Sequence, residues 1–598
     1  MISSLSPIPS LPEPFGPHKV GTAEWEIPIS EIPSPSPVPD PQISTIKFRV
    51  FYPTLPTATS KISAPWLPQP QRAWSEAYAS FLGASPRLSS IFARFTFFLN
   101  YTSLPAIADV PLQPRDRDQS SGYPVVIFSH GLGGNFNAYS AVCASLASFG
   151  IVCVAPEHRD GSAPVSFIRS ADGNIASSID YRRYPHTPTQ EVLTSRNAQL
   201  RIRLWELEQL FTVLSSLDSG ERRFSNYATA PGDRSSGPSD SQSWKDQLDL
   251  RPGRITWAGH SFGACTMVQF VKSVYYHQSA PSLAGTPYEN DFDWRPLYKP
   301  AANSDLLHQI TPESPIALLD LWAMPLRAEQ TSWLWEKPLP CYDRDLKDND
   351  KTTPNVVAIV TAEFHKHPEL LNRMRAALSP NPAEALSMLE NQSSTSPDPR
   401  QEREELTETT AFSTASYTGP SENNAAVVEV QPGVNSNANS KSNSVSPDTS
   451  SVPSRISSPN PGTSDNPSPA SSTTSVSSTS SSPSASDQNP ISNQNSAHPS
   501  HPKLFLIPSS AHLSQSDFGL LFPRLVRYVT KAEDPEEIIA LNVRAVLSVM
   551  RGVGLDVEPF KRSRDSKIAG KENTPVDEDD ILTERCQEKR VIPVPLLD

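Results

Sequence analysis

Continuous apolar runs, rather than alternating ones, dominate the hydrophobic pattern of this 598-residue chain. Runs of five to seven residues predict buried strands at 125–129, 254–258, 314–319, 355–361 and 503–508. Such short runs are typical of strands that are covered on both faces of a sheet. Segments with helical character are predicted at 138–149, 196–214, 264–272 and 368–378. Strands that alternate with helices indicate an α/β fold with a mostly parallel central sheet and helices on both faces.

The pattern is interrupted by one long polar stretch. Residues 391–500 are rich in Ser, Thr, Pro, Asn and Gln and poor in aromatic residues, which predicts a disordered insert. Closing a loop costs only about 0.6 kcal/mol of entropy for each doubling of its length. A single folded core can therefore contain this long insert. We expect a flexible N-terminus at 1–15, a core at 16–390 that resumes at 501–557, and a charged tail at 558–598. A shorter polar insertion is expected within the core at 219–247.

A Gly-x-Ser-x-Gly motif lies between a predicted strand and a predicted helix. The motif is Gly259-His260-Ser261-Phe262-Gly263, after the run 254–258 and before the run 264–272. A serine on so sharp a turn has strained backbone angles, and the flanking glycines avoid clashes with the strand and the helix. In this context the motif predicts a nucleophile elbow with Ser261 as the nucleophile. By itself it more often marks a small-residue turn.

An acid and a base should follow the serine in the order Ser, acid, His. Asp320 comes directly after the predicted strand 314–319, whereas Asp293 and Asp305 lie in polar, loop-like surroundings. Two strands with histidines after them compete for the base. We favour His512, which follows the last strand on a short polar loop, over His365 and His367, which open a charged helix at 368–378.

Two backbone amides are predicted to stabilise the charge that develops on a substrate carbonyl oxygen. One is the amide of Phe262, next to the nucleophile. The second is expected from an earlier strand-to-helix loop, and the chain offers His130-Gly131-Leu132-Gly133-Gly134 after the strand 125–129. We assign this role to the amide of Leu132.

With these motifs, the chain resembles the platelet-activating-factor acetylhydrolase family, calcium-independent phospholipase A2-like enzymes of the α/β-hydrolase fold. The likeness spans roughly 16–390 and 503–555, and the insert departs from the family. The motifs that carry it, besides the nucleophile elbow, are Gly16-Pro17-His18-Lys19-Val20-Gly21, Trp66-Leu67-Pro68, Phe128-Ser129-His130-Gly131-Leu132-Gly133, Glu157-His158-Arg159-Asp160-Gly161-Ser162, Leu319-Asp320-Leu321-Trp322, Pro325-Leu326, Ala511-His512 and Asp517-Phe518.

The resemblance implies a serine esterase that removes short or oxidised sn-2 acyl groups from phospholipids, without a cofactor. It places the triad on Ser261, Asp320 and His512 and the oxyanion donors on Leu132 and Phe262. It also implies contact with a membrane interface through Arg87–Leu99, a segment that mixes four phenylalanines with arginines. The alternative for this segment is an apolar helix that packs on the core near the mouth of the site. The alternatives are a general short-chain carboxylesterase, cutinase-like, and an inactive scaffold that recruits partners through its insert.

Charge and composition exclude other classes. The net charge of −13, with no basic cluster to offset it, disfavours nucleic acid as a partner. No Cys/His cluster has metal-ligand spacing, and the Gly131–Gly134 loop lacks the ending of a phosphate loop. The start of the chain does not resemble a signal peptide, and no apolar run is long enough to span a membrane. With five thinly spread cysteines, these features predict a reducing, cytoplasmic location.

Overall fold

A computed structural model describes most of the predicted core. The described residues are 8–33, 36–61, 63–115, 121–228, 244–344, 353–393, 501–560 and 591–597, with side chains omitted at 389–393. The predicted insert at 391–500 lies outside them except for 391–393, as do most of the polar insertion and most of the charged tail. Among the helices that the described residues form, none has both the length and the apolar character to cross a membrane.

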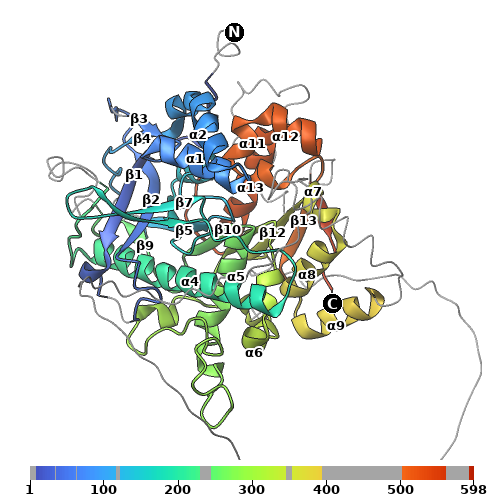
Figure 1. The fold of residues 1–598 in the computed structure, drawn as a ribbon. Helices are drawn as coiled ribbons and strands as arrows, with labels where there is room; N and C mark the ends of the chain where they lie inside the picture. Colours follow the sequence, from blue (N-terminus) through green and yellow to red (C-terminus); the bar gives the residue numbers. More distant parts are fainter. Residues whose placement is uncertain are drawn as a thin grey trace, which may run out of the picture. The chain divides into compact units, whose positions relative to one another are not determined.

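A twelve-stranded sheet forms the centre of this core (Figure 1). From one edge to the other its path is β14 (Ile592–Val594), β13 (Lys503–Ile507), β12 (Val356–Thr361), β11 (Ile316–Leu319), β10 (Thr256–His260), β5 (Tyr123–Ser129), β6 (Val152–Glu157), β2 (Thr45–Thr54), β1 (Lys19–Pro28), β4 (Ser103–Ala108) and β3 (Ser63–Pro65), with β9 (Leu248–Asp249) beside β5. Along the sheet, the six neighbouring strands β6, β5, β10, β11, β12 and β13 run parallel. In contrast, β2 pairs antiparallel with both β6 and β1. The predicted α/β-hydrolase fold is thereby confirmed.

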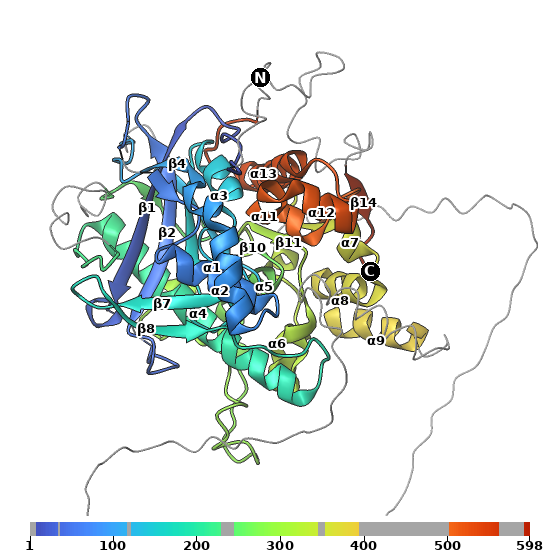
Figure 2. The same ribbon diagram turned by 45° about the horizontal axis from the view of Figure 1, so that its top comes forward.

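Helices cover both faces of the sheet, which explains the continuous apolar runs (Figure 2). In β5, Val125 and Ile127 face one buried cluster, and Val126 and Phe128 face the other. The first cluster includes α4 (Gln190–Ser219) and α5 (Phe262–Tyr275), and the second includes α3 (Ser140–Ala147) and α13 (Pro535–Gly552). Because successive side chains of a strand point to opposite faces, a strand between two helical layers needs apolar residues at every position.

The α4 helix is longer than the predicted segment 196–214. It begins after Thr189, whose side chain accepts a hydrogen bond from the Val192 amide, and it ends at Gly220 with a φ of 70°. Glycine adopts this left-handed conformation at helix ends without steric cost. The capping residues, and not the apolar periodicity, therefore mark the two ends of this helix.

Both ends of the described chain contact the core. Leu11 and Phe15, in the segment 1–15, pack against the cluster that includes α3 and α13. At the other end, β14 lies within the segment 558–598 and pairs antiparallel with β13. The residues around β14 form a short apolar run, Val591-Ile592-Pro593-Val594, which fits an edge strand better than a charged tail.

Candidate active site

Ser261 lies on a strained turn between β10 and α5. Its backbone angles are φ 56° and ψ −116°, a conformation that L-residues rarely adopt. A Cβ atom on Gly263 would overlap the carbonyl group of Ser129, and one on Gly259 would lie 2.5 Å from the carbonyl carbon of Gly263. Both glycines are therefore required for the close approach of strand and helix, as the Gly-x-Ser-x-Gly motif predicted.

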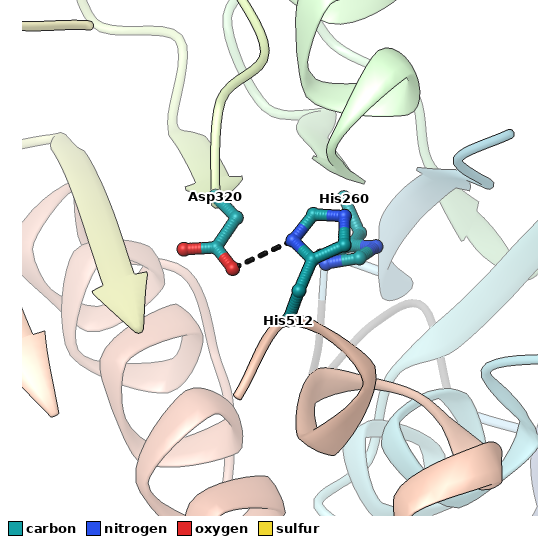
Figure 3. Close-up of side chains that lie close together, drawn as sticks. All are labelled: His260, Asp320 and His512. Atoms are coloured by element: carbon teal, nitrogen blue, oxygen red, sulfur yellow. Dashed lines mark hydrogen bonds and ion pairs between the residues drawn. The ribbon is translucent and has the colours of Figure 1, made fainter. Parts of the chain in front are cut away.

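Asp320 follows β11 and is fully buried beneath the site. Its carboxylate accepts hydrogen bonds of 2.7 Å from both the amide and the hydroxyl of Thr361, at the end of the neighbouring strand β12. These bonds leave Oδ2 directed toward His512 (Figure 3). Since parallel strands end at the same edge of the sheet, β11 and β12 place the acid and its hydrogen-bond donor side by side.

His512 begins a short 3₁₀ helix (His512–Gln515) soon after β13. Its Nδ1 atom lies 2.8 Å from Oδ2 of Asp320, and its amide donates to Glu363 Oε2 at 2.8 Å. The ring stacks on Phe364 at a centroid distance of 5.6 Å. A proton on Nδ1, shared with the carboxylate, leaves Nε2 free to act as a base. The structure thus brings His512 to Asp320, although 192 residues separate them in the chain.

The competing histidines are placed elsewhere, and His367 directly precedes α8 (Pro368–Leu378). His365 ends the short helix α7 (Ala362–His365), and no hydrogen bond joins it to Asp320 among the described residues. The α7 helix does support the site through its other members, because Glu363 and Phe364 hold the backbone and the ring of His512. No motif in the sequence predicted this support.

The serine is close to the acid–base pair but is not bonded to it. Ser261 is 9% exposed, and in the described part of the chain no hydrogen bond joins it to His512. Its amide donates to the Leu319 carbonyl, which immediately precedes Asp320. Hydrogen bonds between a nucleophile and its base are often long before substrate binds. The role of Ser261 as the nucleophile stays a prediction.

Two amides near the serine have no acceptor among the described residues, those of Leu132 and Phe262. Phe262 is the first residue of α5, where backbone amides have no partner within the helix. Leu132 lies on the loop after β5, and a Cβ atom on the adjacent Gly131 would lie 3.1 Å from Cβ of Ser261. The loop therefore passes directly against the nucleophile elbow, where both amides can serve as donors.

The residues His260, Asp320 and His512 also form a group with potential metal-ligand atoms within 4.8 Å of one another. Their hydrogen bonds account for the grouping in another way. Asp320 and His512 bond to each other, and Nδ1 of His260 lies 2.7 Å from the Tyr139 hydroxyl. Burial, and then the neighbouring His512, keeps the pKa of His260 well below its ordinary value, so this histidine is neutral.

Sequence reasoning missed a buried polar cluster behind the Leu132 loop. Ser129 Oγ lies 2.8 Å from Nε2 of His158, and Nδ1 of His158 lies 2.7 Å from Glu206 on α4. Burial raises the pKa of Glu206 to about 8 and holds that of His158 far below its usual range, so burial favours the uncharged form of both groups. The available signal was a series of charged residues, including Arg203 and Glu206, within a helix that has apolar residues on all sides.

A family model matches the first half of the chain. Residues 4–283 match the family model described as "Platelet-activating factor acetylhydrolase, isoform II". This match confirms the resemblance read from the motifs. It includes Leu132, Ser261 and Phe262 but neither Asp320 nor His512, so the assignment of the acid and the base depends on the geometry described above.

Curated relatives carry related names. A protein named "Putative phospholipase A2" from Schizosaccharomyces pombe is 29% identical over 43% of this chain and 58% of its own length. The platelet-activating factor acetylhydrolase of Canis lupus familiaris is 28% identical, and that of Cavia porcellus 31%, each over 37% of this chain and 45% of the relative. The chain thus spans about half the length of the curated relatives it matches.

A solved structure was also similar. A ferulic acid esterase from Streptomyces cinnamoneus matches with a TM-score of 0.32 and 16% identity, over 62% of this chain and 72% of that chain.

Proposed function

We propose that this chain, whose residues 4–283 match the platelet-activating factor acetylhydrolase family, is a carboxylic ester hydrolase that removes short or oxidised sn-2 acyl groups from phospholipids. One observation carries the proposal. The 2.8 Å bond between His512 and Asp320 lies beside a strained serine and two amides that have no acceptor among the described residues. Strained nucleophile, oriented base and free donors are the parts that acyl transfer requires.

The proposed reaction proceeds in two halves. Ser261 Oγ attacks the sn-2 carbonyl carbon while Nε2 of His512 takes the hydroxyl proton, and Asp320 stabilises the imidazolium. The amides of Leu132 and Phe262 bind the oxyanion. The intermediate then expels the lysophospholipid, which takes the proton from His512, and leaves an acyl-serine. Water, activated by the same histidine, hydrolyses that ester and restores Ser261.

Selectivity for phospholipid is tested with substrates that share one reaction. Calcium-free hydrolysis is measured on an sn-2 acetyl phospholipid, an sn-2 long-chain phospholipid and an aryl acetate, with wild type and Ser261→Ala. We expect cleavage of the acetyl phospholipid that Ser261→Ala lowers by at least about 10⁴-fold. Cleavage of the aryl acetate alone would favour a general carboxylesterase. If none of the three substrates is cleaved in a Ser261-dependent way, the inactive scaffold is favoured.

We further propose that the segment Arg87–Leu99 contacts the lipid surface. Most of it forms α2 (Pro86–Phe95), where Leu88 is 58% exposed and Phe95 is 75% exposed. Single exposed apolar residues are ordinary, but several on one basic helix are typical of interfacial binding. A second exposed apolar group, with Leu525 and Tyr528, lies on α12 (Pro523–Thr530). The helices that precede α2 and α12 in the chain, α1 (Gln71–Phe81) and α11 (Asp517–Leu521), meet through a 5.5 Å ring contact between Tyr78 and Phe518.

The docking proposal predicts a loss that depends on the physical state of the substrate. We expect Phe95→Ser to lower hydrolysis of phospholipid in vesicles about tenfold, because the apolar contact is lost, and to leave aryl acetate hydrolysis unchanged. Ile175→Ser, at an exposed position on β8 (Ile175–Asp180), is the control. Equal effects of Phe95→Ser on both substrates would contradict membrane contact by α2.

A further inference from the structure

We propose that Arg203 is a positioning residue that holds both oxyanion donors in their places, an inference that rests on the proposed esterase function. Arg203 lies in the middle of α4 and is fully buried. Its guanidinium forms an ion pair with Asp160, with Nε 2.7 Å from Oδ2, so its charge is neutralised within the core. The remaining nitrogens reach two separate segments of the site.

The first segment is the loop that carries Leu132. Nη1 of Arg203 donates to the carbonyl of His130 at 2.9 Å, on one side of Leu132. Nη2 donates to the Ser162 hydroxyl at 2.6 Å, and the Ser162 carbonyl accepts from the amide of Gly133 at 2.8 Å, on the other side. The residues on both sides of Leu132 are therefore tied, directly or through Ser162, to one guanidinium.

The second segment is the first turn of α5, which carries Phe262. Nη1 of Arg203 also donates to the hydroxyl of Thr266 at 3.2 Å, and that hydroxyl donates to the carbonyl of Phe262 at 2.8 Å. The guanidinium lies over the Phe262 ring, 4.4 Å from its centroid. These contacts hold the carbonyl group and the side chain of the residue whose amide is the second proposed donor.

An arginine is suited to this task and a lysine is not. Only a planar fork with five donors can bond to Asp160, Ser162, Thr266 and the His130 carbonyl at once, because an ammonium group is a compact point charge with three donors. Oxyanion donors act only when they lie about 2.7–3.1 Å from the developing charge. A small displacement of either segment should therefore lower kcat and change KM little, since the interaction forms in the transition state.

The test compares variants along the same connection. We expect Arg203→Lys to lower kcat about 10²-fold, the loss typical of one disabled oxyanion donor, with KM changed by less than about threefold. Thr266→Val, which removes the hydroxyl between Arg203 and Phe262, should lower kcat about tenfold, and Thr266→Ser, which keeps it, should restore most of the activity. Arg201→Lys, on the same helix but bonded to the carbonyls of Phe292, Arg295 and Pro296, is the matched control and should keep wild-type kinetics.

Rates are measured on whichever ester the wild type cleaves, with Ser261→Ala as the blank and circular dichroism as the check of folding. The inference is overturned if folded Arg203→Lys keeps kcat within about threefold of wild type, or if Thr266→Val and Thr266→Ser are equally active. Should Arg203→Lys fail to fold, the Thr266 pair decides. Absence of all Ser261-dependent cleavage in the wild type would overturn the proposed function itself, and this inference with it.

Discussion

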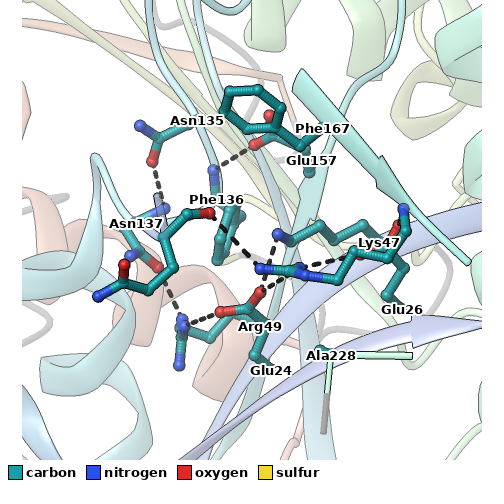
Figure 4. A network of polar contacts seen from close by, with 12 residues as sticks. Glu24, Glu26, Lys47, Arg49, Asn135, Phe136, Asn137, Glu157, Phe167 and Ala228 are labelled. Atoms are coloured by element: carbon teal, nitrogen blue, oxygen red, sulfur yellow. Dashed lines mark hydrogen bonds and ion pairs between the residues drawn. The ribbon is translucent and has the colours of Figure 1, made fainter. Parts of the chain in front are cut away.

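Two regions of the core bury polar groups in opposite ways. Within the paired strands β1 and β2, the carboxylate of Glu24 accepts from Lys47 at 2.8 Å and from Arg49 at 2.7 Å (Figure 4). Nearby, Glu26 pairs with Arg159 at 2.8 Å and Arg169 at 3.1 Å. At the candidate active site, by contrast, the acid is satisfied but the amides of Leu132 and Phe262 have no acceptor among the described residues.

The difference separates structural polar groups from reactive ones. The first region, the Glu24–Glu26 network, places a carboxylate against each neighbouring cation and links β1 and β2 to the hairpin strand β7 (Val165–Arg169) through Arg169. It also reaches the segment that joins the Leu132 loop to α3, because Nε of Arg49 donates to Oδ1 of Asn137 at 2.6 Å. Groups that stabilise a fold are paired within it, whereas groups that stabilise a transition state are held in place without a partner.

The largest effect should come from changing the acid. We expect Asp320→Asn to lower kcat/KM about 10⁴-fold, because the amide cannot hold His512 in the reactive tautomer or stabilise its imidazolium. The thermal unfolding midpoint should change little, since the Glu24–Glu26 network is untouched. Ester hydrolysis and thermal unfolding are measured on the same preparation. Near-full activity would remove Asp320 from the triad.

A substitution in the Glu24–Glu26 network should lower stability and leave activity unchanged. Glu26→Gln should lower the free energy of unfolding by about 3 kcal/mol, because Arg159 is left as an uncompensated buried cation. The kcat of the folded protein should stay unchanged. Urea unfolding gives the first value and initial rates give the second. As a control, Glu76→Gln breaks an exposed pair with Arg72 on α1 (Gln71–Phe81) and should cost less than about 0.5 kcal/mol. Equal losses from the two substitutions would contradict the structural role of the network.

A smaller effect should come from the donor behind the acid. Thr361→Val removes one of the two hydrogen bonds from Thr361 to Asp320, so we expect kcat/KM to fall about tenfold. The hydroxyl also accepts from the Phe364 amide, and for that reason Tm is recorded for each variant. Thr361→Ser keeps the hydroxyl and should behave as wild type. If the two variants have the same kinetics, the bond does not orient the acid.

The smallest effect should be the stability that the Glu24 ion pairs lose at acid pH. Burial alone would raise the pKa of Glu24, but Lys47, Arg49 and Arg169 outweigh burial and lower it from 4.5 to about 2. A depressed carboxyl pKa adds stability that is complete above the unfolded value of 4.5 and is lost as the pH falls toward about 2. We expect the difference in unfolding free energy between wild type and Glu24→Gln to shrink over this interval. Parallel pH curves for the two proteins would contradict the ion-pairing of Glu24.

Much of the architecture could be predicted because it depends on local patterns. Strands such as 355–361, buried on both faces, are apolar at nearly every position, and the structure places β12 at Val356–Thr361. The segment 368–378 was predicted with the bounds that α8 (Pro368–Leu378) has, since a proline marks its start. The hairpin of β7 and β8 was not predicted, because its exposed, polar strand β8 has no apolar run.

The sequence by itself predicted the nucleophile elbow, because the strained turn at Ser261 and the close approach of Gly259 to Gly263 lie within five consecutive residues. Only the tertiary structure decided which histidine meets Asp320 and that Arg203 contacts both the loop of Leu132 and the first turn of α5. Those choices depend on the order of strands in the sheet and on where a buried side chain ends. Contacts between residues far apart in the chain leave no periodic trace in the sequence, so their distances appear only once the sheet and its helices are assembled.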